Sequence, residues 1–105
     1  MTDHIALSDA RFTMDAAGDL AHPLNVLASA PRLRILSLLI QRGEMRVLDL
    51  VEEMPITQPT VSHHVGLLAE AGLVSRRKEG VFAYYKADRK ALRALAAAIR
   101  PAAAR

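Results

Sequence analysis

The apolar residues of this chain recur with a helical period along most of its length. Over residues 31–43 they form a face broad enough to be covered on several sides: Leu33, Ile35, Leu36, Leu39 and Ile40. Pro31 suits the first turn of a helix, where its missing N–H costs nothing, and Gly43 suits the end of one. The pattern predicts a central helix here. A first helix precedes it, with apolar positions at Leu20, Leu24 and Leu27.

Two further helices follow with little chain between them. The first is short, ends before Pro55, and has four apolar residues that we expect to face inward: Val47, Leu48, Leu50 and Val51. The second starts at the N-cap residue Thr57 and ends near Gly72. Its apolar face consists of Val61, Val65 and Leu68. Its polar face includes Gln58, Ser62 and His63. A short helix, a tight turn and a second helix with small polar residues are the parts of a helix-turn-helix.

Beyond residue 72 the pattern changes from helical to strand-like. Two β-prone runs, residues 73–77 and 81–86, flank a turn over residues 78–80 in which Gly80 supplies the positive φ. Asp88 then caps a last helix that ends before Pro101. The apolar stripe of this helix consists of Leu92, Leu95, Ala96 and Ile99. A hairpin directly after the second helix makes the helix-turn-helix a winged one.

The predicted fold is mainly α-helical with one two-stranded β-hairpin. Residues 1–19 form an N-terminal arm and the start of the first helix, residues 20–100 form the winged helix-turn-helix domain, and residues 101–105 form a tail. The 105 residues suffice for one domain with a modest core, which chains this short often complete by pairing with a second copy.

The charge along the chain is uneven. Residues 1–53 carry five arginines and eight acidic residues, a net charge of −3, whereas residues 54–105 carry nine basic and three acidic residues, a net charge of +6. A basic half beside an acidic half suggests that one surface faces a polyanion.

The chain has no cysteine, which excludes disulfides, thiolate metal sites and thiol-based redox sensing. Its longest apolar run, around residues 35–40, is far shorter than a membrane span, and no secretory leader opens the sequence. We therefore expect a cytoplasmic protein with no membrane partner and no cofactor. The sequence shows no nucleophile–base pair, phosphate loop or carboxylate cluster that would indicate an enzyme.

Three segments resemble the ArsR/SmtB family of bacterial repressors. ASAPRLRILSLL is similar to the family's LADPTRLRILxLL, PITQPTVSHHVGLLAEAGLV to LSQSTVSHHLKxLxxAGLV, and RRKEGVFAYYKA to the wing motif RREGRxxYYxL. The match covers roughly residues 23–99, with the segments in family order and spacing. It implies a dimeric repressor of its own operon. Such a dimer places one recognition helix, the second helix of the motif, in each of two major grooves of a palindromic operator in double-stranded DNA.

The polar residues of the recognition helix and of the wing are the candidate DNA contacts. Gln58 can pair with an adenine edge, and short side chains such as Ser62 can reach other bases. Cations near the tip of the wing can reach phosphates or the minor groove. The candidate contacts are Thr57, Gln58, Thr60, Ser62, His63, Arg76, Arg77 and Lys78. The resemblance itself implies five of them: Gln58, Ser62, His63, Arg77 and Lys78. His64 lies beside the apolar face and is expected to pack against the protein.

The resemblance places the dimer interface on the first and last helices. The candidate interface residues are Leu20, Leu24, Leu92, Leu95 and Ile99. The apolar stripe of the last helix has an alternative role, because it can equally seal the core of a single chain.

Relatives that sense metals use two sets of ligands, and this chain matches neither. The family motif ELCVCDL reads EMRVLDL at residues 44–50, so that Arg46 and Leu48 replace the two cysteines, and neither side chain binds a soft metal. The other site requires Asp-x-His and two further ligands on the last helix, where this chain keeps only Asp88. The resemblance therefore predicts no metal at either usual site.

Two alternatives stay open. A winged helix can be a protein–protein interaction module, although such a module loses the polar face and the charged wing that this sequence keeps. A nickel-, copper- or zinc-responsive repressor is the second alternative, with His4 as a weak candidate ligand once Met1 is removed. A variant of this idea is a site between subunits that combines His4, His22 and Asp9.

Overall fold

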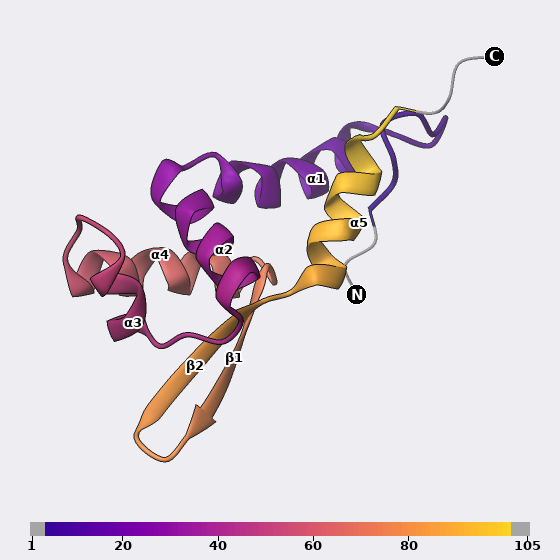
Figure 1. Cartoon of the computed structure of the whole chain (residues 1–105). Coiled ribbons are helices and arrows are strands. Elements are labelled where there is room, and N and C mark those ends of the chain that lie inside the picture. Colours follow the sequence, from indigo (N-terminus) through magenta and orange to yellow (C-terminus); the bar gives the residue numbers. More distant parts are fainter. Residues whose placement is uncertain (1–3, 102–105) are drawn as a thin grey trace.

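The computed structural model describes residues 4–101, and its elements follow the predicted order (Figure 1). The helices and strands are α1 (Met14–Leu27), α2 (Ala30–Arg42), α3 (Val47–Glu52), α4 (Gln58–Glu70), β1 (Val74–Glu79), β2 (Phe82–Ala87) and α5 (Arg89–Ile99). The prediction of a mainly helical winged helix-turn-helix with one two-stranded antiparallel hairpin is therefore confirmed.

Capping residues set the ends of several helices, because the first N–H groups and last carbonyls of a helix have no partner inside it. Asp88 accepts a hydrogen bond of 2.9 Å from the backbone N–H of Ala91, which starts α5 as predicted. Gly43 ends α2 with a φ of 82°, a conformation that glycine adopts without strain. Thr57 is the N-cap residue of α4, but its hydroxyl lies 3.0 Å from the hydroxyl of Thr60 and caps no backbone N–H.

The hairpin is longer than the sequence pattern indicates. Its strands pair from Val74 opposite Ala87 to Glu79 opposite Phe82, so the turn consists of two residues, Gly80 and Val81. Gly80 has a φ of 61°, as predicted for the turn. The strands continue through residues 78 and 79 because a two-residue loop suffices to reverse an antiparallel pair.

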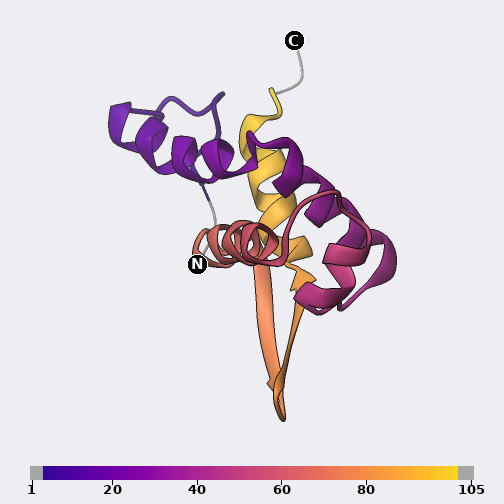
Figure 2. The ribbon, with the colours of Figure 1, turned by 90° about the vertical axis from the view of Figure 1, so that its left-hand side faces the viewer.

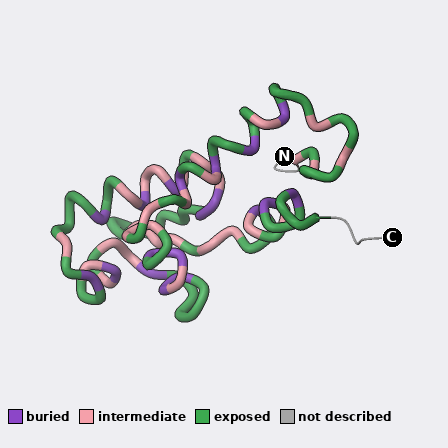
Figure 3. Tube along the Cα trace, turned by 90° about the horizontal axis from the view of Figure 1, so that it is seen from above, coloured by how far each residue is buried: buried purple, intermediate pink, exposed green. Residues whose placement is uncertain are grey.

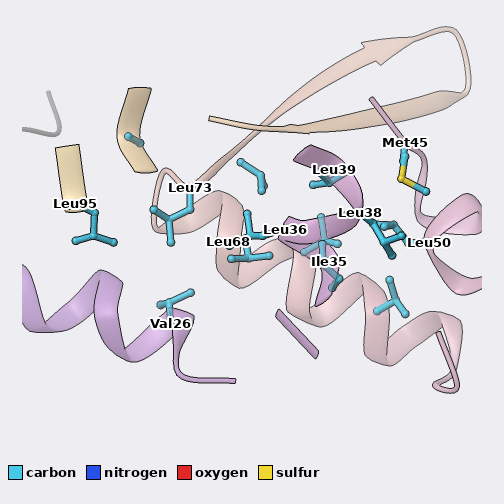
Figure 4. Close-up of a cluster of buried hydrophobic side chains, with 14 of the residues drawn as sticks. Val26, Ile35, Leu36, Leu38, Leu39, Met45, Leu50, Leu68, Leu73 and Leu95 are labelled. Atoms are coloured by element: carbon cyan, nitrogen blue, oxygen red, sulfur yellow. The ribbon is translucent and has the colours of Figure 1, made fainter. Parts of the chain in front are cut away.

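The hairpin projects away from the helices, while α5 returns beside α1 (Figure 1 and Figure 2). The helices enclose a single cluster of buried apolar side chains, in which Leu95 of α5 lies across from Val26 of α1 (Figure 4). The most completely buried large side chains are Ile35, Leu38, Leu39, Leu50, Val61, Val65 and Leu68. Since α2 and α4 supply most of these residues, the core holds the recognition helix by its apolar face.

Three residues that the pattern placed inside are instead exposed. Leu33 is 52%, Ile40 39% and Leu48 47% exposed, and the burial along the chain is drawn in Figure 3. Leu33 and Ile40 lie two turns apart on one side of α2, which no other element among residues 4–101 covers. Together with Leu27, Leu36 and Leu92 they line an apolar groove. Leu48 is exposed because α3 is a six-residue helix that turns Leu50, not Leu48, into the core.

The candidate dimer residues divide into two groups. Leu20 and Leu95 are each 3% exposed in the single chain, so they belong to its own core and offer no surface to a second copy. For Leu95 this burial agrees with the alternative role of the α5 stripe, which is to seal the core of a single chain. Leu24 and Leu92 are half-buried and Ile99 is exposed, so these three retain accessible surface.

Among residues 4–101 no single helix is long and apolar enough to span a membrane. Only α1 and α2 taken together reach the length and composition of a span, and they are bent by 82° where they meet.

Candidate DNA-binding surface

The two faces of α4 differ sharply in burial. Val61, Val65 and Leu68 are completely buried against the core, which fixes the rotation of the helix about its axis. The opposite face carries the predicted contact residues, all exposed: Thr57, Gln58, Thr60, Ser62 and His63. Within residues 4–101 the side chains of Gln58, Ser62 and His63 form no hydrogen bond, so their polar groups are available to an outside partner.

Arg77 of the wing is engaged inside the protein. Its Nε and Nη2 donate to the two carboxylate oxygens of Glu44, each at 3.0 Å, and its Nη1 pairs with Glu79. The guanidinium carbon also lies 4.8 Å from the centre of the Tyr84 ring, the residue directly opposite on β2. The structure thus gives Arg77 internal partners that the sequence pattern did not reveal, and these contacts fasten the wing to the segment before α3.

The ion pair between Arg77 and Glu44 persists at neutral pH. Its hydrogen bonds hold the pKa of the Glu44 carboxyl below its ordinary value and raise the pKa of Arg77. Because the carboxyl pKa is lowered on folding, the contribution of this pair is complete above the ordinary pKa of glutamate and is lost only as the pH falls through the lowered value.

A second arginine joins α3 to the same face of the hairpin. Arg46 binds the Asp49 carboxylate through Nε at 3.1 Å and Nη2 at 2.8 Å, and its guanidinium carbon lies 5.0 Å from the centre of the Phe82 ring. The backbone also connects the two parts, through reciprocal hydrogen bonds of 2.9 Å between Met45 and Tyr85. Only the strand register brings these groups together, since Arg46 and Phe82 are 36 positions apart.

Arg76 and Lys78 have a different environment from Arg77. They lie on the other face of β1, since side chains alternate along a strand, and both are exposed. Within residues 4–101 neither forms an ion pair or a side-chain hydrogen bond. These two cations of β1 are therefore available to a polyanion.

The predicted alternative metal ligands are only partly brought together. His4 and His22 line one cavity of about 200 Å³ with Asp19, whereas Asp9 pairs with Arg11 elsewhere on the arm. In the described part of the chain, no three His, Asp or Glu side chains are placed to hold a metal ion. The amino-terminal nitrogens needed for a site around His4 belong to residues 1–3, outside the described residues.

The sequence and the structure both match known regulators. Residues 29–76 match the family model described as "Bacterial regulatory protein, arsR family". The arsenical resistance operon repressor of Escherichia coli is 41% identical over 61 residues, which are 58% of this chain and 52% of the repressor. A solved structure of a possible transcriptional regulator for arsenical resistance is 39% identical, with a TM-score of 0.67 over 72% of this chain and 78% of its own. This chain belongs to the ArsR family.

One ArsR-family neighbour bears on assembly. The homodimeric winged helix-turn-helix DNA-binding domain of a possible ArsR-family regulator from Mycobacterium bovis is 32% identical, with a TM-score of 0.69 over 88% of this chain and 84% of that domain. An HTH-type transcriptional regulator of Methanocaldococcus jannaschii is 46% identical over 54 residues, which are 51% of this chain. The chain spans only 52% to 61% of the length of the first curated relatives that it matches. The family relationship is therefore established over the winged helix-turn-helix.

Proposed function

We propose that this ArsR-family chain is a cytoplasmic, sequence-specific regulator that binds double-stranded DNA and represses its own operon. The observation that carries the proposal is the polar face of α4, which is exposed opposite a fully buried apolar face. A helix presented in this way can enter the major groove, where Gln58, Ser62 and His63 meet base edges. Arg76 and Lys78 of the wing then lie on phosphates of the flanking backbone.

A dimer would place two recognition helices on one operator. The related domain from Mycobacterium bovis is homodimeric, and in this chain Leu24, Leu92 and Ile99 keep accessible apolar surface on α1 and α5. The apolar groove lined by Leu33 and Ile40 extends this surface along α2. A two-fold symmetric dimer then requires a palindromic operator whose half-sites are about one helical turn apart.

The repressor would not use thiolates to sense its signal. The chain contains no cysteine, and the segment in which the family motif has two cysteines carries Arg46 and Leu48. Arg46 is bound to Asp49 and lies over Phe82, so its positively charged guanidinium occupies the place where the family motif would bind a metal ion.

A gel-shift titration with the DNA upstream of its own gene tests the proposal. We expect a retarded band at protein concentrations that leave a random duplex of the same length unbound, at low and at physiological salt. Equal retardation of both duplexes would show that the chain binds DNA without sequence preference. If neither duplex is retarded, a protein–protein interaction module becomes the better assignment.

Replacing Gln58 tests the assignment of the recognition helix. Gln58→Ala removes a side chain that can bind one base in two places, so affinity for the specific duplex should fall by about 1–3 kcal/mol, or roughly 5- to 150-fold. The preference at one position in each half-site should relax as well, which binding to duplexes substituted at single positions will measure. An equal loss on specific and random duplexes would contradict a base-reading role.

A further inference from the structure

A partly buried polar contact joins the recognition helix to α2. His64 is half-buried on α4, directly after His63, and its ring centre lies 5.7 Å from that of His63. Its Nδ1 lies 3.0 Å from Nη1 of Arg32, which belongs to the first turns of α2. A guanidinium has donors and no acceptor, so Nδ1 must accept this hydrogen bond. The bond therefore requires a neutral ring with its proton on Nε2.

Arg32 is itself held in place by the end of α1. Its Nε donates to the carbonyl oxygen of Val26 at 2.5 Å, and its backbone N–H donates to Oγ of Ser29 at 3.4 Å. The carbonyls at the end of a helix are unpaired and carry partial negative charge, so a cation there is stabilised. One planar side chain thus joins the last turn of α1 to the middle of α4, two elements more than thirty residues apart.

The surroundings of His64 favour the neutral ring. Burial, then the charge of Arg32, then that of His63 lower the pKa of the His64 imidazole. The other elements that pack on α4, namely α1, α3 and β1, bring no ionisable group of residues 4–101 close enough to shift it further. A proton on Nδ1 would remove the acceptor and place two cations 3.0 Å apart.

We propose that Arg32 is a positioning residue for DNA recognition, which holds α4 at a fixed angle to α1 through His64 and releases it when His64 takes up a proton. The inference rests on the proposed function, because the angle matters only if α1 forms the dimer and α4 enters DNA. In a dimer, two recognition helices must meet grooves about 34 Å apart, so a small rotation of α4 against α1 moves both out of register.

An NMR titration without DNA tests whether this link exists. Arg32→Met keeps the apolar stem of the side chain but removes its charge and donors, and Arg34→Met is the matched control, because Arg34 is exposed on the same helix. We expect the wild-type His64 ring to carry its proton on Nε2. Its pKa should rise in Arg32→Met and stay unchanged in Arg34→Met. If the pKa and the tautomer of the His64 ring are the same in Arg32→Met as in the wild type, the proposal is overturned.

DNA binding by the same variants tests the positioning role. The probe is a duplex selected by the wild-type protein from a randomised library. Arg32→Met should bind it roughly tenfold more weakly, as expected for the loss of a hydrogen bond between a charged and a neutral group, while Arg34→Met matches the wild type. The salt dependence should not change, because Arg32 touches no phosphate. A slope reduced by about one unit would make Arg32 a direct phosphate contact and would overturn the inference.

Two substitutions at His64 keep the test decisive if Arg32→Met does not fold. His64→Gln offers an amide oxygen to Arg32 and cannot be protonated, whereas His64→Leu offers no acceptor. We expect His64→Gln to bind the selected duplex like the wild type and His64→Leu to bind it roughly tenfold more weakly. Equal affinities of the two variants would overturn the proposal.

The pH profile separates this role from a merely structural one. In the wild type, the ratio of affinities for the selected and a random duplex should fall only as the pH drops through the lowered pKa of His64, which lies below the ordinary histidine value of about 6.5. His64→Gln should abolish this dependence, and His22→Gln, a control at an exposed histidine of α1 outside the DNA-binding surface, should retain it. Persistence of the dependence in His64→Gln would contradict the proposal. A wild-type protein that selects no duplex would overturn the proposed function and with it this role of Arg32, while the NMR titration would still show whether the link exists.

Discussion

Replacing Arg76 and Lys78 together by alanine is expected to weaken DNA binding about 60-fold at 0.1 M salt and to lower the salt slope by about 2. Both cations are exposed on one face of β1 and, within residues 4–101, have no ion-pair partner. Each phosphate that a cation neutralises contributes a slope of about −0.9, because its condensed counterions are released. The 60-fold figure assumes that the double variant loses two such contacts and that it binds DNA as tightly as the wild type at 1 M salt. Titrations at four salt concentrations, with specific and random duplexes, measure both quantities.

Arg77→Ala is the matched control for this pair of substitutions. Arg77 is already paired with Glu44 and Glu79, so its removal should alter the salt slope far less than the removal of Arg76 and Lys78. Some affinity should still be lost, because the wing loses its side-chain link to Glu44 and keeps only the backbone bonds between Met45 and Tyr85 as its attachment to the segment before α3. If the salt slope falls by a full unit in Arg77→Ala and stays unchanged in the Arg76 and Lys78 double variant, then Arg77 contacts phosphate and the other two cations do not.

Leu50→Ala is expected to cost about 2–5 kcal/mol of the free energy of unfolding. Leu50 is completely buried between α3 and the rest of the core, so its truncation leaves a cavity under the helix-turn-helix. A domain of this size is typically stable by about 5–15 kcal/mol, so the loss is a large fraction of the total. Urea unfolding followed by circular dichroism, at a fixed protein concentration, measures the change.

Leu48→Ala, two residues earlier on the same short helix, provides the control. Leu48 is 47% exposed, and we expect its truncation to change the free energy of unfolding by about 0.5 kcal/mol or less. A loss as large as that of Leu50→Ala would mean that a second copy of the chain covers Leu48. Repeating the measurement at lower protein concentration would then show a smaller difference between Leu48→Ala and the wild type.

Local sequence patterns predicted the elements well because the signals that define them are local. The capping carboxylate of Asp88 and the positive φ of Gly80 each act within a few residues, and the structure has both where the sequence places them. The predicted boundaries of the hairpin strands were less accurate. Residues 78 and 79 are intrinsically poor strand residues, and pairing with β2 determines their conformation.

The polar face of α4 was also readable from sequence, because the buried residues Val61, Val65 and Leu68 fix which side of the helix faces out. The same reasoning failed for Leu33, Ile40 and Leu48. Helical period shows which residues share a face, but whether another element covers that face depends on how the helices pack.

The sequence by itself determined the family, the order of the elements and the outward face of the recognition helix, since these follow from contacts and spacings within short segments. Only the tertiary structure decided which cation of β1 has partners among residues 4–101. Arg76, Arg77 and Lys78 are equivalent as sequence letters, and they differ because Glu44 and Tyr84 meet Arg77 alone. The tertiary structure also places Arg32 between Val26 and His64. Charge and hydrogen bonding act through space, so the partners of a side chain are set by the packing of distant segments.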